Sequence, residues 1–236
     1  MFLGILNYWK QNMLKRLQDY NRNGLKWIRR GRRKVLRRHI PFKANYGYNS
    51  MKKKGSKMKK ILNCYLSANV HKNSNALVID AETLCTSREL KKTGGMNPSN
   101  VTVMNYDENV IRKAKKNGFH GFSGISTNIL KSQMNQEFDI IYLDYCGTPE
   151  CSKNGFNPKF DIETCLHILK RKGVMAVTFS KRCKNAVEKA RKLFPRRSKI
   201  VVQHDYFETA AMVVFIVGHR TIDAKKHLKM FNNLLN

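Results

Sequence analysis

The amino-acid sequence predicts an α/β fold with a mostly parallel β-sheet that ends in an antiparallel pair of strands. From about residue 61 onward, short apolar runs rich in β-branched residues alternate with stretches of helical pattern, an order typical of parallel sheets. The last two runs, Lys199–His204 and Ala211–Val217, are separated only by the loop Asp205–Thr209. No crossover helix fits into so short a loop, so these two strands must be antiparallel.

Each expected element follows from its local pattern. Short continuous apolar runs are typical of strands buried on both faces of a sheet, and apolar residues three or four apart indicate helices. The expected strands are Ala76–Ile79, Val101–Met104, a short strand within Gly118–Gly124, Phe138–Leu143, Val174–Phe179, Lys199–His204 and Ala211–Val217. Helical stretches are expected through Arg88–Lys92 and over Glu108–Lys116, Ile125–Met134, Asp161–Leu169 (which Gly173 is expected to stop) and Asn185–Phe194.

The stretch Phe138–Thr148, FDIIYLDYCGT, is the centre of the predicted sheet. Its almost unbroken apolar run ends on Asp144, and a Tyr-Cys-Gly turn follows. Ligands of open α/β sheets gather at the carboxyl ends of parallel strands, so Asp144, Tyr145 and Cys146 are candidate catalytic residues. The alternative is a core strand whose terminal Asp144 only caps the next turn.

The chain is strongly basic, with a formal net charge of +30 and a pI near 10.2. A charge of this size in a chain with enough apolar residues to fold is most simply matched by a polyanion. The expected partner is nucleic acid, either DNA or RNA, and an anionic membrane surface is the alternative. Charge alone does not indicate an enzyme.

The first 60 residues differ from the rest and are expected to form a basic arm and linker ahead of an α/β domain at 61–236. Apolar residues at loose helical spacing predict one or two basic amphipathic helices, broken near Asn21–Gly24, and Ile40–Lys60 is expected to be a linker. Four roles remain open for this arm: nucleic-acid binding, membrane binding, a removed targeting segment and a disordered tail. The residues expected to contact nucleic acid are Arg29, Arg30, Arg32, Arg33, Arg37, Arg38, Lys52, Lys53 and Lys54.

The six cysteines are scattered, and no CxxC pair or zinc-ligand spacing occurs. We therefore expect free thiols in a reducing intracellular compartment, such as the nucleus, a viral factory or an organelle, and no metal site. No apolar run approaches the roughly 20 residues that a membrane-spanning helix needs.

The order of strands, helices and acidic residues over Leu62–Gly218 resembles the Rossmann-like class of S-adenosylmethionine-dependent methyltransferases. In that family, acids after the first two strands and a polar residue after the third bind the cofactor, and the turn after the fourth strand faces the methyl group and the substrate. The cofactor-binding residues that the resemblance implies are Asp80, Glu82 and Thr83 after the first strand, Asn105 and Asp107 after the second, and Ser126 and Thr127 after the third.

The sequence departs from the family pattern at two turns. No glycine occurs between Asp80 and Gly94, where the family has a glycine-rich loop. Two consequences stay open: Leu84 and Cys85 obstruct the approach of the cofactor, or the hydroxyls of Thr83, Thr86 and Ser87 take the place of the glycine loop. The turn after the fourth strand, Asp-Tyr-Cys-Gly, also lacks the Asp/Asn-Pro-Pro-aromatic motif of amino-group DNA methyltransferases. A nucleophilic role for Cys146 and a role as a small turn residue are both compatible with that turn.

Two functions follow from these patterns. The first is an S-adenosylmethionine-dependent methyltransferase that acts on RNA or DNA, with Asp144 orienting the nucleophile. The alternative is a catalytically inactive protein of the same fold that binds or packages nucleic acid through its basic surface. The acids at successive strand ends favour the enzyme, and the glycine-free first turn favours the binding protein.

Overall fold

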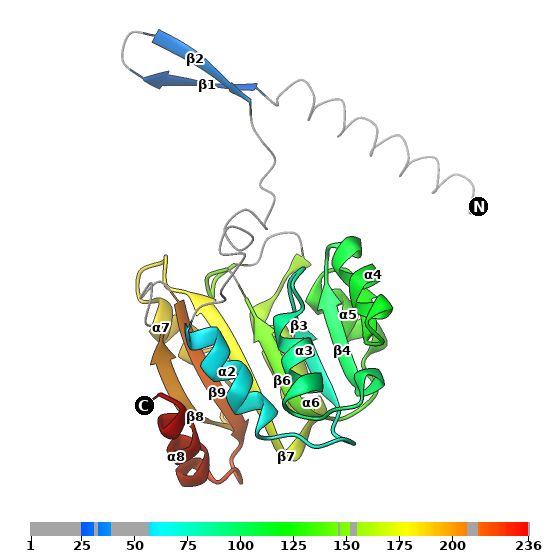
Figure 1. Cartoon of the computed structure of the whole chain (residues 1–236). Helices are drawn as coiled ribbons and strands as arrows, with labels where there is room; N and C mark the ends of the chain where they lie inside the picture. Colours follow the sequence, from blue (N-terminus) through cyan, green and yellow to red (C-terminus); the bar gives the residue numbers. More distant parts are fainter. Residues whose placement is uncertain are drawn as a thin grey trace, which may run out of the picture. The chain divides into compact units, whose positions relative to one another are not determined.

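The computed structural model describes residues 25–30, 33–38, 57–145, 147–151, 155–206 and 212–235. The chain divides into two compact units, Met1–Lys52 and Lys53–Asn236. Each is described by itself below (Figure 1).

The N-terminal unit contains a β-hairpin of β1 (Leu25–Arg30) and β2 (Arg33–Arg38). The strands are antiparallel, and Arg30 pairs with Arg33 across a two-residue link that begins with Gly31. The helical arm predicted over these residues is therefore wrong. Aromatic and β-branched residues favour strands, and a glycine at the start of a two-residue link favours a hairpin. The rest of the expected arm lies outside the described residues.

The second unit is built on a seven-stranded sheet in the order β5-β4-β3-β6-β7-β9-β8. The strands are β3 (Ala76–Ile79), β4 (Val101–Asn105), β5 (His120–Ser123), β6 (Phe138–Asp144), β7 (Leu169–Ser180), β8 (Ser198–Asp205) and β9 (Met212–His219). The first five are parallel to one another, and β9 runs antiparallel between β7 and β8. The predicted mostly parallel sheet with a terminal antiparallel pair is confirmed.

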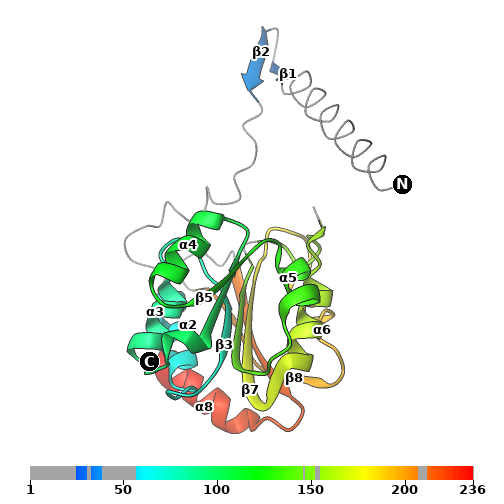
Figure 2. The same cartoon turned by 90° about the vertical axis from the view of Figure 1, so that its right-hand side faces the viewer.

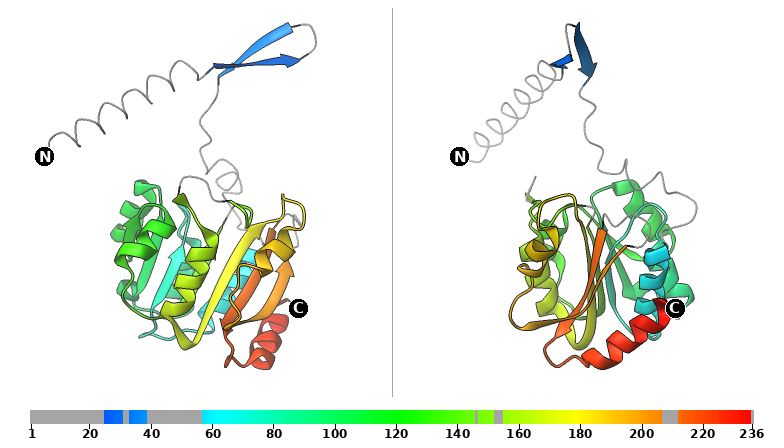
Figure 3. Two further views of the ribbon diagram at one scale, coloured as in Figure 1. Left: turned by 180° about the vertical axis from the view of Figure 1, so that it is seen from behind. Right: turned by 90° about the vertical axis from the view of Figure 1, so that its left-hand side faces the viewer.

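Helices cover both faces of this sheet, so the unit has three layers (Figures 2 and 3). The helices are α2 (Lys57–Ser67), α3 (Cys85–Lys92), α4 (Glu108–Lys116), α5 (Ser126–Gln133), α6 (Pro158–Ile168), α7 (Ala186–Arg191) and α8 (Ala224–Leu235). Buried side chains of α2, α3, α4 and α8 pack on one face, and those of α5, α6 and α7 pack on the other. Because both faces are covered, the central strands are apolar on both sides.

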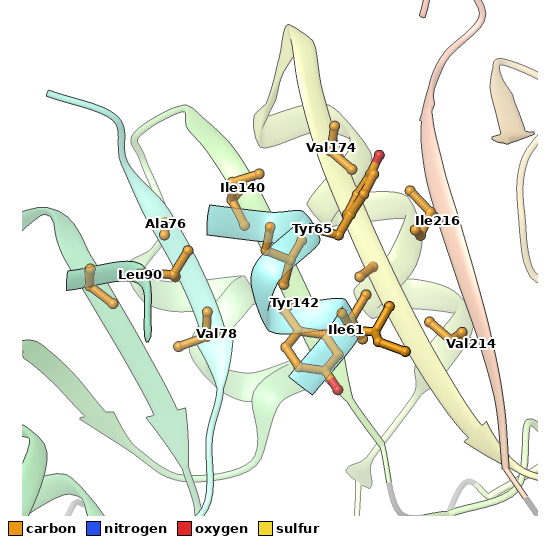
Figure 4. Close-up of a cluster of buried hydrophobic side chains, with 14 of the residues drawn as sticks. Ile61, Tyr65, Ala76, Val78, Leu90, Ile140, Tyr142, Val174, Val214 and Ile216 are labelled. Carbon is orange, nitrogen blue, oxygen red and sulfur yellow. The ribbon is translucent and has the colours of Figure 1, made fainter. Parts of the chain in front are cut away.

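The core on the α2 side is centred on two tyrosines. Tyr65 of α2 and Tyr142 of β6 are fully buried among aliphatic side chains of the central strands (Figure 4). Tyr65 also packs edge-on against Phe231 of α8, with ring centroids 5.7 Å apart. The two helices that flank the folded unit in sequence, α2 and α8, are thereby held together on one face of the sheet.

Several expected element boundaries differ from the structure. The expected linker runs to Lys60, but α2 already begins at Lys57. The helix expected to end at Leu169 ends at Ile168, and Gly173 lies inside β7 instead of stopping the helix. A Cβ at Gly173 would lie 2.9 Å from the Asp139 carbonyl oxygen, so the close approach of β6 requires glycine there.

Candidate functional site

The carboxyl ends of β3, β4 and β5 meet at one edge of the sheet, where sequence reasoning places the cofactor. The side-chain amide of Asn105 donates to the Asp80 carbonyl oxygen at 2.7 Å, and the Gly124 amide donates to the Asn105 carbonyl oxygen at 3.0 Å. Asn105 therefore links the ends of all three strands, and its side chain is engaged within the protein.

The turn after β3 is held by Asp80. One oxygen of its carboxylate accepts hydrogen bonds from both the backbone amide and the hydroxyl of Ser87, each at 2.8 Å. The Asp80 residue is only 3% exposed. A carboxylate that accepts from the first turn of a helix stabilises that helix end, so Asp80 anchors α3 to the sheet.

In the turn after β3, Leu84 adopts a backbone conformation that glycine usually provides. This residue has φ 51° and ψ 39°, the left-handed conformation that glycine adopts readily, and its side chain is fully buried in the core. The neighbouring Glu82, Thr83 and Cys85 are exposed. The Leu84 side chain thus packs into the core, away from the surface of the turn, whereas Cys85 remains exposed.

The turn after β4 contains an aspartate that caps a helix and an exposed aromatic ring. One carboxylate oxygen of Asp107, Oδ1, accepts from the Asn109 amide at 2.9 Å at the start of α4. Oδ2 of Asp107 has no hydrogen-bond partner among the described residues. Tyr106, next to it, is 51% exposed. A free carboxylate oxygen and a flat apolar ring thus lie side by side in the chain at this edge.

Ser126, Thr127 and Tyr145 converge on one buried carboxylate, Asp161 of α6. Their hydroxyls donate to Asp161 at 2.5, 2.6 and 2.9 Å respectively. The backbone amide of Asn157 in turn donates to the Thr127 hydroxyl at 2.9 Å. These contacts join the segment after β5, the end of β6 and the start of α6.

Burial governs the titration of this cluster. The pKa of Asp161 is raised above its ordinary value because burial penalises the charged carboxylate, although the three hydroxyl donors oppose this shift. Burial beside Asp161 also raises the pKa of the Tyr145 phenol well above its ordinary range. Tyr145 packs against Phe156 with ring centroids 4.9 Å apart. Sequence reasoning missed Asp161, whose only signal was an acid on the apolar face of a predicted helix.

The Asp144 carboxylate, at the end of β6, contacts one side chain of α2 and one of β7. Its Oδ2 lies 2.5 Å from the ammonium group of Lys59, and its Oδ1 accepts from the Thr178 hydroxyl of β7 at 2.6 Å. Lys59 comes from α2 and was not predicted as a site residue, since it lies in a stretch that reads as a lysine-rich linker. Both oxygens of Asp144 therefore have partners within the protein.

The remaining predicted site residues are only partly described. Cys146 lies outside the described residues, as do Arg32, Lys52, Lys53 and Lys54. The residues of the hairpin β1–β2 that were expected to bind nucleic acid are Arg29, Arg30, Arg33, Arg37 and Arg38.

Where the structure describes the chain, neither a pocket nor a group of metal ligands marks the predicted site at the carboxyl ends of the strands. Two surface pockets of the described residues, of about 860 Å³ and about 600 Å³, contain none of the predicted site residues. No group of His, Cys, Asp and Glu suited to a metal ion occurs in the described part of the chain. Cys64, Cys85, Cys151, Cys165 and Cys183 are free thiols. No helix in the described ranges has the length and apolar character needed to cross a membrane.

Comparison with solved structures identifies the fold. An rRNA methylase from Streptococcus thermophilus superposes with a TM-score of 0.52 at 12% identity, over 67% of this chain and 94% of that chain. TrmN from Thermus thermophilus superposes with a TM-score of 0.50 at 14% identity, over 68% of this chain and 47% of that chain. A Streptococcus mutans protein solved in complex with SAH superposes with a TM-score of 0.50 at 14% identity, over 68% and 97%.

At these identities the likeness concerns the fold alone, and it confirms the Rossmann-like methyltransferase fold predicted from the sequence. The sequence itself matches no protein-family model. It also matches no curated protein.

Proposed function

We propose that this chain is an S-adenosylmethionine-dependent methyltransferase that acts on nucleic acid. The observation that carries the proposal is the strand order β5-β4-β3-β6-β7-β9-β8, with β9 inserted antiparallel between β7 and β8. Solved structures with a similar fold include an rRNA methylase and a protein in complex with SAH. A fold hosts many functions, so the site residues must supply the rest of the support.

The residues at the carboxyl edge fit the cofactor in outline. Because the Leu84 side chain is buried and its backbone is left-handed, the turn after β3 follows a path that glycine would take, with Glu82 and Thr83 exposed beside it. Oδ2 of Asp107 suits a ribose hydroxyl, and the exposed ring of Tyr106 suits an adenine face. Asp80, Ser126 and Thr127 instead position the surrounding turns through their internal hydrogen bonds.

When bound, S-adenosylmethionine supplies an electrophilic methyl group, and the protein aligns it with the acceptor atom. Asp144 has both carboxylate oxygens engaged, so its part is to fix the end of β6 beside α2 and β7. Tyr145, which is buried and donates to Asp161, is a positioning residue for the turn that follows β6.

A nucleic-acid substrate is supported by charge. The formal net charge of +30 favours binding to a polyanion. Arginine-rich strands β1 and β2 lie in the N-terminal unit, and further basic residues occur throughout the second unit. The neighbours with similar folds include an rRNA methylase.

One set of contacts favours the alternative, a protein of this fold that binds nucleic acid without methylating it. Asp80, Asn105, Ser126 and Thr127 are engaged in hydrogen bonds within the protein. Of the predicted cofactor-binding residues, Glu82 and Thr83 are exposed, and Asp107 has one carboxylate oxygen without a hydrogen-bond partner among the described residues. Cofactor binding therefore separates the two functions.

Calorimetric titration of the full chain with S-adenosylmethionine and with its demethylated product, in the absence of nucleic acid, tests the proposal. We expect micromolar binding, on the order of −8 kcal/mol. The full chain is needed because a protein shortened to begin at residue 62 would lack the first turn of α2 together with Lys59.

Asp107→Asn is the informative variant, since asparagine still caps α4 while the charge that would bind ribose is lost. We expect about tenfold weaker binding of the cofactor, whereas Glu108→Gln, which removes the same charge one residue further on, should bind it as the wild type does. No detectable binding at millimolar cofactor by a folded wild-type chain would refute the enzyme and leave the binding protein.

A further inference from the structure

One of the two pockets described above, of about 860 Å³, lies at the opposite edge of the sheet, among the amino ends of β7 and β8 and the end of β9. Its lining includes Arg171, Arg196, Arg197 and Arg220, together with His167 and His219. Glu137 is the one acidic residue that lines it. Four arginines and a single acidic residue thus line one open surface pocket.

Two of these arginines are held in place by contacts other than ion pairs. Arg197 donates to the Glu163 carbonyl oxygen at 2.9 Å and lies 3.2 Å from the His167 ring nitrogen Nδ1. The Nε atom of Arg220 donates to the Arg196 carbonyl oxygen at 2.6 Å. A carbonyl oxygen orients a guanidinium group without neutralising its charge, and each group keeps further N–H donors for a ligand.

None of these four arginines forms an ion pair with a described residue. The salt bridges found in the described part of the chain are made by lysines: Lys59, Lys170, Lys181 and Lys189. Arg171, Arg196, Arg197 and Arg220 are all exposed. Four like charges around one pocket repel each other, and a bound anion would relieve this repulsion.

We propose that this arginine pocket binds backbone phosphates of a nucleic acid. Guanidinium groups match phosphate oxygens in a bidentate geometry. The volume, about 860 Å³, is at the upper end of the range for small-ligand sites and far exceeds the size of one phosphate ion. The pocket is wide and open to solvent, so it has room for several consecutive phosphates of a nucleic acid strand.

The pocket is separate from the candidate cofactor site. Strand β7 begins at the pocket with Leu169 and ends eleven residues later at Ser180, on the carboxyl edge. At about 3.3 Å per residue, the two edges are roughly 35 Å apart. A nucleic acid that fills the pocket is thus anchored far from any methyl group, and this binding does not depend on methyl transfer.

The test is the binding of a fluorescein-labelled oligouridine to the full chain, followed by fluorescence anisotropy over a series of salt concentrations without cofactor. Arg171→Gln combined with Arg196→Gln should weaken binding on the order of tenfold. It should also make the slope of log affinity against log salt shallower by about 1.4, as expected for two lost phosphate contacts on a single strand. Both side chains are exposed, so the fold should be retained.

Two matched variants separate the pocket from general charge. Lys115→Gln combined with Lys116→Gln removes the same charge from exposed positions on α4 and should leave the slope close to that of the wild type. Arg171→Lys combined with Arg196→Lys should retain the wild-type slope. Equal losses in the two glutamine variants, or an unchanged slope in the arginine-to-glutamine variant, would overturn the proposal.

Two further probes identify the anion. Titration with sodium pyrophosphate, and sedimentation with phosphatidylserine vesicles, are compared between the wild type and the arginine-to-glutamine variant. If the substitutions abolish binding of either probe while oligouridine binding is unchanged, the occupant is a small phosphate or a membrane, and the nucleic-acid assignment is wrong. These measurements contain no cofactor, so their result is independent of the calorimetric test of methyltransferase function.

Discussion

Lys59 and Asp144 form an ion pair that joins helix α2 to the end of the central strand β6. The ammonium nitrogen lies 2.5 Å from Asp144 Oδ2 and 3.2 Å from the Tyr142 hydroxyl, and it sits 4.4 Å from the centroid of the Tyr142 ring. The side chains of Lys59 and Asp144 are only 12% and 7% exposed. An interaction this deeply buried fixes α2 on the sheet at the edge where the candidate site lies.

Removing one member of this pair should destabilise the fold strongly. Lys59→Met leaves the Asp144 carboxylate without its cation, and Asp144→Asn leaves the ammonium group without its anion. Each single variant should lower the free energy of unfolding by about 3 kcal/mol, because a nearly buried charge loses an oppositely charged neighbour. Urea unfolding followed by circular dichroism measures both.

The double variant Lys59→Met, Asp144→Asn tests the coupling. It removes both charges, and the asparagine oxygen can still accept from the Thr178 hydroxyl, so the total loss should be smaller than the sum of the single losses by more than about 1 kcal/mol. Additive losses would mean that the two side chains stabilise the protein independently. Lys181→Met, at a more exposed ion pair with Asp205, serves as the control and should cost less than about 1 kcal/mol.

The raised pKa of Asp161 predicts a definite pH dependence of stability. The folded protein holds the proton of this buried carboxyl to higher pH than the unfolded chain does. The stabilisation from this group is thus complete below the unfolded pKa of about 3.9 and is lost as pH rises through the folded value. Asp161→Asn stays neutral at every pH. As the pH rises from about 4 to about 7, the stability of this variant should therefore increase relative to that of the wild type.

The control for Asp161 is Glu163→Gln on the same helix. Glu163 is partly exposed, and its substitution removes one carboxylate without touching the hydroxyl cluster. The stability difference between this variant and the wild type should vary less with pH over the same range in urea unfolding. If the Asp161→Asn difference is flat, the carboxyl is ionised at all these pH values and its burial has little energetic consequence.

His227 should respond to pH in the opposite sense. Its ring nitrogen Nδ1 lies 2.7 Å from the Tyr65 hydroxyl, and burial, aided by Lys226 and opposed by Asp223, lowers its pKa. A lowered pKa gives stabilisation that is present above the unfolded value of about 6.5 and is lost as pH falls.

Because His227 attaches α8 to α2, its protonation should weaken the contact between these helices. The thermal midpoint of the wild type should therefore fall between about pH 7 and about pH 5 by more than that of His227→Gln. Glutamine can accept from Tyr65 and does not titrate. An equal fall in both proteins would assign the pH dependence to other groups.

The sheet could be predicted from the sequence because its strands are buried on both faces and therefore form continuous apolar runs. Helices α2 and α8 could not be found as easily. Helix α2 has five apolar residues that contact the core, but three lysines stand at its beginning. The beginning of α2 therefore resembles the lysine-rich linker that precedes it. In α8, only His227 and Phe231 are deeply buried, which gives a weak pattern.

The positions of the polar residues at the strand ends were predictable, but their partners were not. Parallel strands place Asp80, Asn105 and Asp144 at one edge by topology alone. Their hydrogen bonds depend on residues distant in sequence: Asp144 pairs with a lysine 85 residues before it, and Ser126 binds a carboxylate 35 residues after it. Such contacts follow from how the helices pack on the sheet, and no local pattern in a single sequence encodes them.

Leu84 offers a test of how the turn after β3 manages without glycine. Leu84→Gly would remove a left-handed strain of about 1 kcal/mol and would also remove a fully buried leucine side chain, whose loss costs about 2–5 kcal/mol. The variant should therefore be less stable in urea by about 2 kcal/mol. Asn185→Gly changes the other left-handed residue that is not a glycine in the described part of the chain; this residue is exposed, and the change should alter stability by less than about 0.5 kcal/mol. If Leu84→Gly is instead more stable than the wild type, strain dominates at this turn, and the leucine is retained for a reason other than packing.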